Sequence, residues 1–358
     1  MALMENIDLV IRNFFTVILL TFVFGCSHSY MITEKEAVQG PESDYLVIIV
    51  IHGDSDYLYH TAEGVPVQAN EKALEMALDV ARKGKKGEFF ILHQQPKKRF
   101  MYMISRRSSE LYHFKNGEIF QHVKYRNEAD DEPFLSTEAH LYRELSESSQ
   151  IENRQLYFLY FGHEISVEGE SRYFTSRPKM TVNAESFASG LQKFLKDDES
   201  FSLVTLSTCS NGTPLMARHL SPFTHYLLAS PQNLHLSYFN IGKLNRLESN
   251  PKISPDEVAA AMAKQSYQRL SDTIQTVVSL SIYDLEKTAD YLEEFYLKYE
   301  RHLLENQPNL YRENIDCGEL PFFDKEKYTV GVTTFFRAPR FGSQASGEDH
   351  SGWGCKQK

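Results

Sequence analysis

Short apolar runs of strand length recur along the chain, and helical patterns separate most of them. The runs occupy residues 44–51, 88–92, 156–161, 201–206 and 225–230. The first is continuous and rich in β-branched residues, which is typical of a strand buried on both faces of a sheet. Alternating strands and helices predict an α/β fold, with a mainly parallel central sheet and helices on both of its faces. With 358 residues, the chain is long enough to bury such a core.

Further local signals place elements around this sheet. Helical patterns cover residues 70–82, 137–146, 184–196 and 284–304, and a further strand is expected at 277–282. Ser254-Pro255-Asp256-Glu257 has the form of a capping box with Pro at the first helical position, so a helix begins there. Asn116-Gly117 lies within the alternating residues 99–125, which predicts a β-hairpin.

These elements divide the chain into regions. We expect one folded domain at residues 44–305 and a C-terminal extension at residues 306–337. Gly, Ser and polar residues dominate from residue 338 to residue 358, and this composition predicts a disordered tail.

The first 26 residues have a different character. Residues 14–25 are uncharged and apolar but short for a transmembrane helix, and Arg12 precedes them. Val23-Phe24-Gly25-Cys26 resembles a bacterial lipobox, so a signal peptide at 1–26 is expected, with Cys26 lipidated after cleavage. An uncleaved membrane anchor is the alternative. The lipobox interpretation implies an exported bacterial protein, anchored to the cell envelope by lipid, with Ser27 favouring the outer membrane and residues 27–43 forming a tether.

Charge and cysteine content exclude several classes of protein. The net charge is −10 and no basic stripe is present, so no nucleic-acid partner is expected. Four cysteines are too few for a disulfide scaffold, and no CxxC pair indicates zinc, so we expect neither a metal nor a cofactor. Cys317 and Cys355 can pair, although their spacing does not decide it. Cys209 is the interior thiol that needs an explanation.

Two strand–helix units place a His and a Cys at strand ends. The strand at 156–161 leads to Gly162-His163, and the strand at 201–206 leads to Ser207-Thr208-Cys209. Functional residues gather at the carboxyl ends of parallel strands, where the loops converge. There His163 can take the proton of the Cys209 thiol and later donate one to a leaving amine. This placement predicts a Cys–His catalytic dyad.

Strings at several strand ends resemble the caspase–hemoglobinase cysteine peptidases (clan CD). FSLVTLSTCSNG (Phe201 to Gly212) is similar to their nucleophile strand, and YFLYFGH (Tyr157 to His163) to their His strand. VIIVIHGDSDYL (Val47 to Leu58) and TVVSLSIYDL (Thr276 to Leu285) resemble segments of the clostripain-like members. The resemblance covers roughly residues 44–300 and implies a caspase-like three-layer α/β/α sandwich. Around the Cys, the string is closer to CHAT and separase-like relatives.

The resemblance also implies roles for residues beside the dyad. The backbone N–H groups of Glu164 and Cys209 are expected to form the oxyanion hole, although relatives have Gly where this chain has Glu164. Clostripain-like enzymes carry an Asp at the position of Ser207, so the P1 preference stays open. Asp54, Ser207 and Ser230 are candidates for substrate binding.

Two rival hydrolase classes are excluded. Ile51-His52-Gly53 could belong to an α/β-hydrolase, but the chain has no Gly-x-Ser-x-Gly elbow. His163-Glu164 opens a zincin motif, but Val167 stands in place of the second His.

The function expected from the sequence is that of a cysteine endopeptidase. It would be a monomer that hydrolyses a peptide or protein substrate through His163 and Cys209. The alternative is a catalytically inactive surface lipoprotein that uses the caspase-like fold as a binding module.

Overall fold

Strand β1 (Tyr45–His52) lies at the centre of the fold, and all eight of its residues are buried. In the computed structural model its side chains alternate between two hydrophobic clusters, as the period of a strand requires. Leu46, Ile48 and Val50 face one cluster, and Tyr45, Val47, Ile49 and Ile51 face the other. A strand with two apolar faces needs a packed layer on each side of the sheet.

The structure describes a defined part of the chain, all of it within one compact unit, Thr33–Lys358. The described residues are 43–54, 58–60, 66–95, 98–100, 104–106, 109–125, 133–146, 154–166, 171–172, 180–234, 239–306, 314–342, 345 and 347–356. The predicted signal peptide, Cys26 and residues 27–42 of the tether lie outside them. No helix of the described residues is long and apolar enough to cross a membrane.

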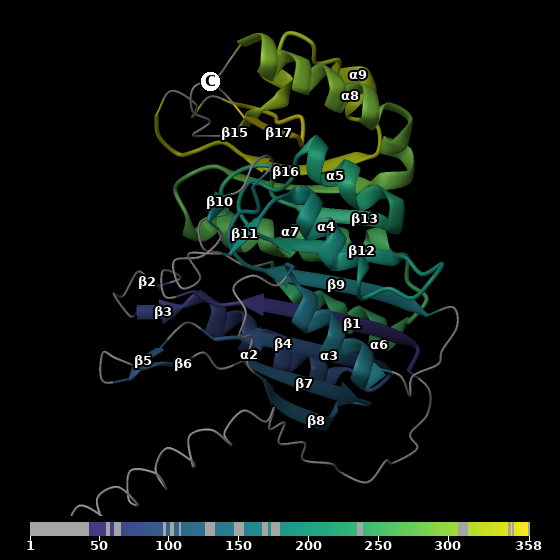
Figure 1. The fold of residues 1–358 in the computed structure, drawn as a ribbon. Coiled ribbons are helices and arrows are strands. Elements are labelled where there is room, and N and C mark those ends of the chain that lie inside the picture. The colour runs from purple at the N-terminus through teal and green to yellow at the C-terminus, as the bar shows by residue number, and fades with distance from the viewer. Residues whose placement is uncertain are drawn as a thin grey trace, which may run out of the picture. The chain divides into compact units, whose positions relative to one another are not determined.

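A nine-stranded sheet runs through the described residues, in the order β16-β14-β13-β12-β9-β1-β4-β7-β8 (Figure 1). Besides β1, its strands are β4 (Gly87–Gln94), β7 (Ser109–Lys115), β8 (Glu118–Tyr125), β9 (Gln155–Phe161), β12 (Phe201–Ser207), β13 (Thr224–Ala229), β14 (Val278–Asp284) and β16 (Val332–Arg337). The five strands from β13 to β4 are parallel to one another, and the pairs outside them are antiparallel. The mainly parallel sheet expected from the sequence is confirmed at its centre.

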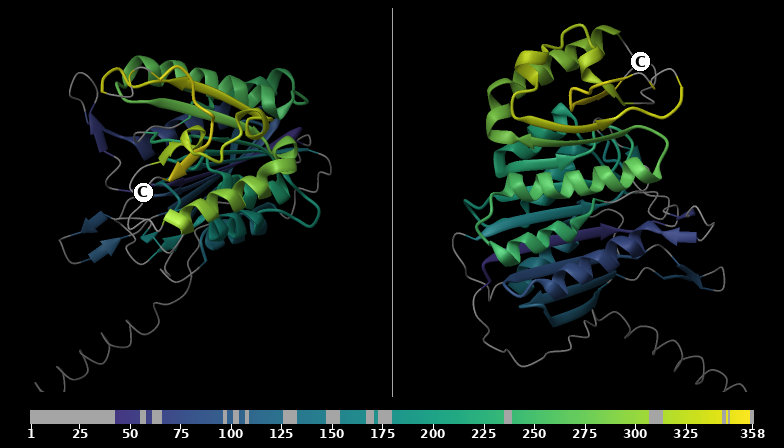
Figure 2. Two further views of the ribbon diagram at one scale, coloured as in Figure 1. Left: turned by 90° about the horizontal axis from the view of Figure 1, so that it is seen from above. Right: turned by 180° about the vertical axis from the view of Figure 1, so that it is seen from behind.

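Helices cover both faces of this sheet (Figure 2). One face packs against α2 (Ala69–Lys83), η2 (Ile241–Asn245), α6 (Arg246–Ser249) and α7 (Pro255–Thr273). The other packs against α3 (Ser136–Ser146), α4 (Ala184–Gln192), α5 (Pro214–Leu220), the short η1 (Ser221–Phe223) and α8 (Leu285–Asn306). The predicted three-layer α/β/α sandwich is therefore confirmed.

The turn and capping motifs of the sequence predict some ends of helices and strands correctly and others incorrectly. Strands β7 and β8 form a hairpin whose turn, Asn116-Gly117, has φ of 54° and 78°, as the two-residue hairpin turn requires. The predicted hairpin began too early, because β5 (Lys98–Phe100) and β6 (Ile104–Arg106) form a small ladder of their own. Helix α7 begins at Pro255, but Ser254 hydrogen-bonds the Asp256 carboxylate and does not cap the helix backbone.

Among the described residues, three further two-stranded ladders lie outside the main sheet. They are β2 (Leu58–His60) with β3 (Pro66–Gln68), β10 (Ser171–Arg172) with β11 (Thr181–Val182), and β15 (Asn314–Asp316) with β17 (Gly354–Lys356).

The prediction of a disordered tail from residue 338 is wrong for residues 347–356. Trp353 there is fully buried, and Cys355 forms a disulfide with Cys317. Two short elements, η3 (Cys317–Glu319) and α9 (Lys325–Tyr328), lie in the preceding extension, whose strand β16 pairs with β14. The Gly- and Ser-rich composition gave no sign of order because the partners of Trp353 and Cys355 lie far away in sequence.

A buried carboxylate near the start of β4 joins β4 to β7 and to the residue that precedes β9. Glu88 is 1% exposed and hydrogen-bonds His113 Nε2 at 2.8 Å and Arg154 Nη1 at 2.7 Å. Burial opposes ionisation of Glu88, but the hydrogen bonds and charges of His113 and Arg154 outweigh it and lower the pKa to about 2.

The low pKa of Glu88 predicts acid-sensitive stability. A carboxyl whose pKa falls on folding stabilises the fold above the unfolded value near 4.5, and this stability is lost as the pH falls through about 2. Urea titrations from pH 7 to pH 2 should show a loss on the order of 3 kcal/mol in the free energy of unfolding. Glu88→Gln should remove most of this dependence. Glu75→Gln, in an exposed pair with Lys72, should leave it unchanged.

Candidate active site

Four neighbouring parallel strands end at one edge of the sheet, and each is followed by a residue predicted to be functional. β1 leads to Asp54, β9 to His163, β12 to Cys209 and β13 to Ser230. In the register, Ile51 pairs with Phe161, and Phe161 pairs with Ser207. The residues just beyond these pairs therefore follow adjacent strands and lie at similar positions along the strand direction. The structure thus brings the strand ends that carry His163 and Cys209 side by side.

His163 is held by a buried carboxylate. Its Nε2 lies 3.1 Å from Asp54 Oδ2, and Asp54 is completely buried while the His163 side chain is 29% exposed. A carboxylate that is ionised only accepts hydrogen bonds, so with Asp54 ionised Nε2 is the donor of this bond. That tautomer leaves the lone pair on Nδ1, the nitrogen that can accept a proton. Asp54 was predicted to bind substrate, and the structure gives it an orienting contact with His163.

Cys209 lies at the edge of the core. It is partly exposed, packs against the cluster formed with α2 and α7, and donates its thiol hydrogen to Asn233 Oδ1 at 3.1 Å. Asn233 is exposed in the segment that follows β13. Among the described cysteines, Cys317 and Cys355 form the disulfide that the sequence left open, and Cys209 is the thiol.

A buried asparagine joins the two loops of the predicted dyad. Asn211 Oδ1 accepts the N–H of Ile165 at 3.0 Å, and its Nδ2 donates to the Ile165 carbonyl at 2.7 Å. Asn211 is fully buried, so both bonds form away from water. Asn211 lies two residues after Cys209, and Ile165 lies two residues after His163. The amide therefore fixes the spacing of the loops, and no sequence motif distinguishes it from an ordinary loop asparagine.

The chain turns sharply after Cys209. Ser210 has a φ of 52°, a left-handed conformation that is unfavourable for a residue with a Cβ, and its N–H donates to the Gln232 carbonyl at 2.9 Å. Thr213 then caps α5, its hydroxyl accepting the N–H of Met216, with Pro214 at the first helical position. This cap ends the loop that carries the thiol.

The hydroxyl groups of Ser207 and Ser230 form hydrogen bonds with backbone groups of neighbouring segments. Ser207 Oγ accepts the N–H of Phe239 at 3.0 Å, and Ser230 Oγ lies 2.8 Å from the carbonyl oxygen of Ser279. Both residues are buried. Their contacts keep the loops after β12 and β13 in place, and the predicted contact with substrate stays a prediction.

A second buried network of hydrogen bonds supports the end of β1. Its residues were not predicted to belong to the site. His52 Nε2 lies 3.3 Å from Glu138 Oε1, and its Nδ1 lies 3.1 Å from the Tyr160 hydroxyl. His52 and Glu138 are each 1% exposed. These contacts join β1, β9 and α3 two residues before Asp54, so they steady the strand end from which the carboxylate extends.

The remaining candidates concern the oxyanion hole and metals. The side chain of Glu164 is exposed, so its charge is in contact with solvent, and its role and that of Cys209 as backbone donors stay predictions. Within the described ranges, no group of three or more His, Cys, Asp or Glu residues is arranged to hold a metal ion.

Comparison with known proteins identifies solved structures that share this fold. No protein-family model matches the chain, and no curated protein matches it. An inactive zymogen C11 protease from Parabacteroides distasonis superposes with a TM-score of 0.59 at 13% identity, covering 89% of this chain and 93% of that one.

Two structures of a secreted C11 cysteine protease from Bacteroides thetaiotaomicron also superpose. The protease called iotapain gives a TM-score of 0.51 at 10% identity, covering 73% of this chain and 71% of that one. The structure in complex with an irreversible peptide inhibitor gives 0.52 at 11% identity, covering 73% and 70%. The chain therefore has the fold of the C11 cysteine proteases.

Proposed function

We propose that this protein is a cysteine endopeptidase in which Cys209 is the nucleophile, His163 the general base and Asp54 the residue that positions His163. The observation that carries the proposal is the hydrogen bond from His163 to the buried Asp54, beside the strand end that bears Cys209. A nucleophile, a base and a group that orients the base are the parts of a covalent hydrolase site. The fold shared with C11 cysteine proteases supports the same function.

The proposed reaction follows from these roles. His163 takes the thiol proton on Nδ1, and the Cys209 sulfur forms a bond to the carbonyl carbon of the scissile peptide. The N–H groups of Glu164 and Cys209 stabilise the negative charge on the carbonyl oxygen. The C–N bond then breaks as His163 gives its proton to the leaving amine, and water hydrolyses the acyl-enzyme by the reverse sequence of proton transfers.

The substrate is a peptide or protein. An inhibitor peptide is bound in one of the C11 structures that share this fold. Ser207 stands where clostripain-like relatives have an Asp, and it is buried and bonded to Phe239. This position therefore supplies no negative charge, and we propose a P1 preference that does not depend on a carboxylate there.

Labelling of the thiol separates the peptidase from the inactive binding module. An electrophilic peptide probe should modify Cys209, and His163→Ala should reduce the rate at least about 100-fold because the thiol loses its base. His225→Ala is the control, since His225 contacts Ser200 and lies at the opposite end of β13 from Ser230. Mass spectrometry locates the adduct. Equal, slow labelling with and without His163 would support the binding module instead.

Replacement of the carboxylate tests the role of Asp54. Asp54→Asn keeps the size of the side chain but can present an N–H to the imidazole, which favours the wrong tautomer. We expect kcat to fall by about 10²- to 10⁴-fold with little change in KM. Asp44 is an exposed residue beside the other end of β1, and Asp44→Asn should leave kcat unchanged. A kcat within a few-fold of wild type would remove Asp54 from the mechanism.

We propose further that the protein is exported and anchored to the bacterial cell envelope through lipid on Cys26. The Cys317–Cys355 disulfide supports export, because structural disulfides form and persist in oxidising compartments. A secreted protein among the structures of the same fold supports it as well.

Detergent partition tests the anchor. In a bacterium that processes lipoproteins, the wild-type protein should enter the detergent phase of Triton X-114, because acyl chains supply the apolar area that holds it there. Cys26→Ala should incorporate no labelled fatty acid, because it lacks the thiol that is acylated, whereas Ser29→Ala should incorporate as much as the wild-type protein. Wild-type protein in the aqueous phase would disprove lipidation.

A further inference from the structure

A short C-terminal segment is packed into the core beside the candidate active site. We call residues 350–355 the latch. Trp353, the only tryptophan of the chain, is fully buried, and its ring lies 4.4 Å from that of Tyr283 and 5.7 Å from that of Phe295. Its Nε1 donates to the carbonyl of Tyr328 at 2.7 Å. Both the apolar ring and its one polar atom are thus accommodated.

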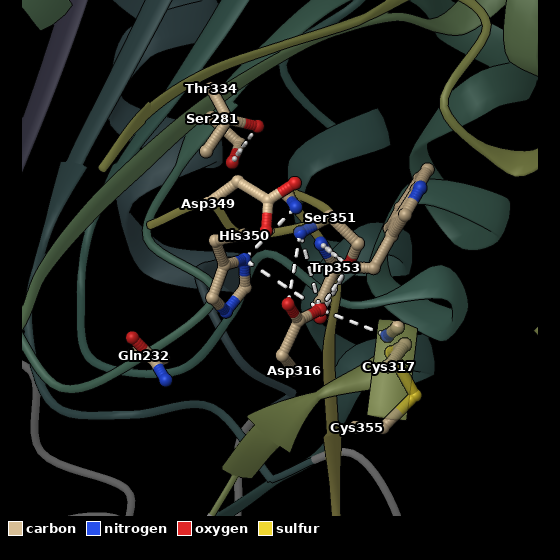
Figure 3. A network of polar contacts seen from close by, with 12 residues as sticks. Gln232, Ser281, Asp316, Cys317, Thr334, Asp349, His350, Ser351, Trp353 and Cys355 are labelled. Carbon is tan, nitrogen blue, oxygen red and sulfur yellow. Dashed lines mark hydrogen bonds and ion pairs between the residues drawn. A yellow bond between two sulfur atoms is a disulfide. The ribbon is translucent and has the colours of Figure 1, made fainter. Parts of the chain in front are cut away.

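The latch is fastened to residues 314–318 by several bonds (Figure 3). Cys355 is joined to Cys317 by the disulfide, and the N–H of Cys317 donates to the Trp353 carbonyl at 2.9 Å. Asp316 accepts the N–H of Ser351 at 3.0 Å and also the Ser351 hydroxyl. A covalent bond, backbone pairing and a carboxylate therefore converge on the same few residues.

The latch also holds the loop that carries the proposed nucleophile. The N–H of Gly354 donates to the Gly212 carbonyl at 2.8 Å, and the Tyr283 hydroxyl donates to the Gly352 carbonyl at 2.5 Å. On the other side, the N–H of Gly212 donates to the Ser230 carbonyl at 2.8 Å. Gly212, three residues after Cys209, is therefore bonded to the latch through one atom and to the segment after β13 through another.

The space around Gly212 and Gly352 shows how closely these chains approach. A Cβ on Gly212 would lie 2.4 Å from the Tyr283 hydroxyl, and a Cβ on Gly352 would lie 2.4 Å from Thr334 Oγ1. Gly352 also has a φ of +90°, which side chains rarely allow. The close contact between the latch and the loop of Gly212 therefore requires glycine at positions 212 and 352.

We propose that the latch positions the loop of Cys209 for catalysis and that the Cys317–Cys355 disulfide keeps the latch in place. The inference rests on the proposed peptidase function, since positioning matters for rate only if Cys209 reacts. The thiol and the N–H of Cys209 both depend on the path of this loop, and displacements of about 1 Å at a reacting centre lower rates about 100-fold. Residues 350–355 act through the loop and do not touch substrate.

The test removes the Cys317–Cys355 disulfide and measures Trp353 fluorescence, hydrogen exchange and kcat. In the Cys317→Ser/Cys355→Ser variant, the fluorescence of Trp353 should shift to longer wavelength as the ring meets water. Hydrogen exchange at the amides of Ser210 and Gly212 should be about 10-fold faster, because their acceptors stay but their loop loosens. The kcat for a peptide substrate should fall about 10-fold, with KM within about two-fold of wild type.

A conservative variant covers the case in which the double variant does not fold. Tyr283→Phe removes the hydroxyl bond to the latch and leaves the disulfide intact. Tyr267→Phe is its matched control, because it removes a similar bond to the carbonyl of Phe336. Tyr283→Phe should accelerate exchange at Ser210 and Gly212 and lower kcat, and the control should do neither.

Each outcome decides the proposal. A shifted Trp353 emission with unchanged exchange and kcat would overturn the positioning role, and an unshifted emission would overturn the role of the disulfide. If the wild-type protein cleaves no peptide and Cys209 does not depend on His163, the proposed function fails. Hydrogen exchange at Ser210 and Gly212 then still decides whether the latch holds the loop.

Discussion

The in-register parallel pairing of β1, β9 and β12 is the constraint on which the rest of the site depends. Ile51, Phe161 and Ser207 lie side by side across these strands, so the chains leave the sheet at the same height. A shift of one residue in either pairing would turn every side chain of the shifted strand to the opposite face of the sheet. The two hydrophobic clusters on either side of β1 therefore fix the register, and the register fixes where Asp54, His163 and Cys209 begin.

Beyond the ends of the strands, hydrogen bonds from side chains replace the backbone hydrogen bonds of the sheet. Gly162 N–H still reaches the Ser207 carbonyl at 3.4 Å, but further on Asn211 replaces such pairing by bonding both backbone groups of Ile165. An amide can do this because it carries a donor and an acceptor in one plane. Ser207 and Ser230 act similarly on neighbouring segments. Side-chain hydrogen bonds therefore hold these loops although they have no regular secondary structure.

The parts of this arrangement that could be predicted from the sequence are those with local signals. Apolar runs of strand length gave the central strands, and a His and a Cys directly after such runs gave the candidate dyad. Asn211 could not be predicted, because its importance depends on Ile165, a contact across two loops. Trp353 and Cys355 were assigned to a disordered tail for the same reason, since their burial comes from Tyr283, Phe295 and Cys317. The resemblance to CHAT and separase-like proteins near Cys209 stays a prediction.

The bond from Gly354 to Gly212 has a consequence for the order in which the protein is made. A ribosome releases the loop of Cys209 well before residues 350–355 exist, so for a time the Gly212 carbonyl must bond to water. The last three strands of the large sheet, β13, β14 and β16, are synthesised during that interval, whereas the contact from Gly354 requires β17. The nascent chain therefore carries its thiol on a loop that is completed only after the sheet beneath it.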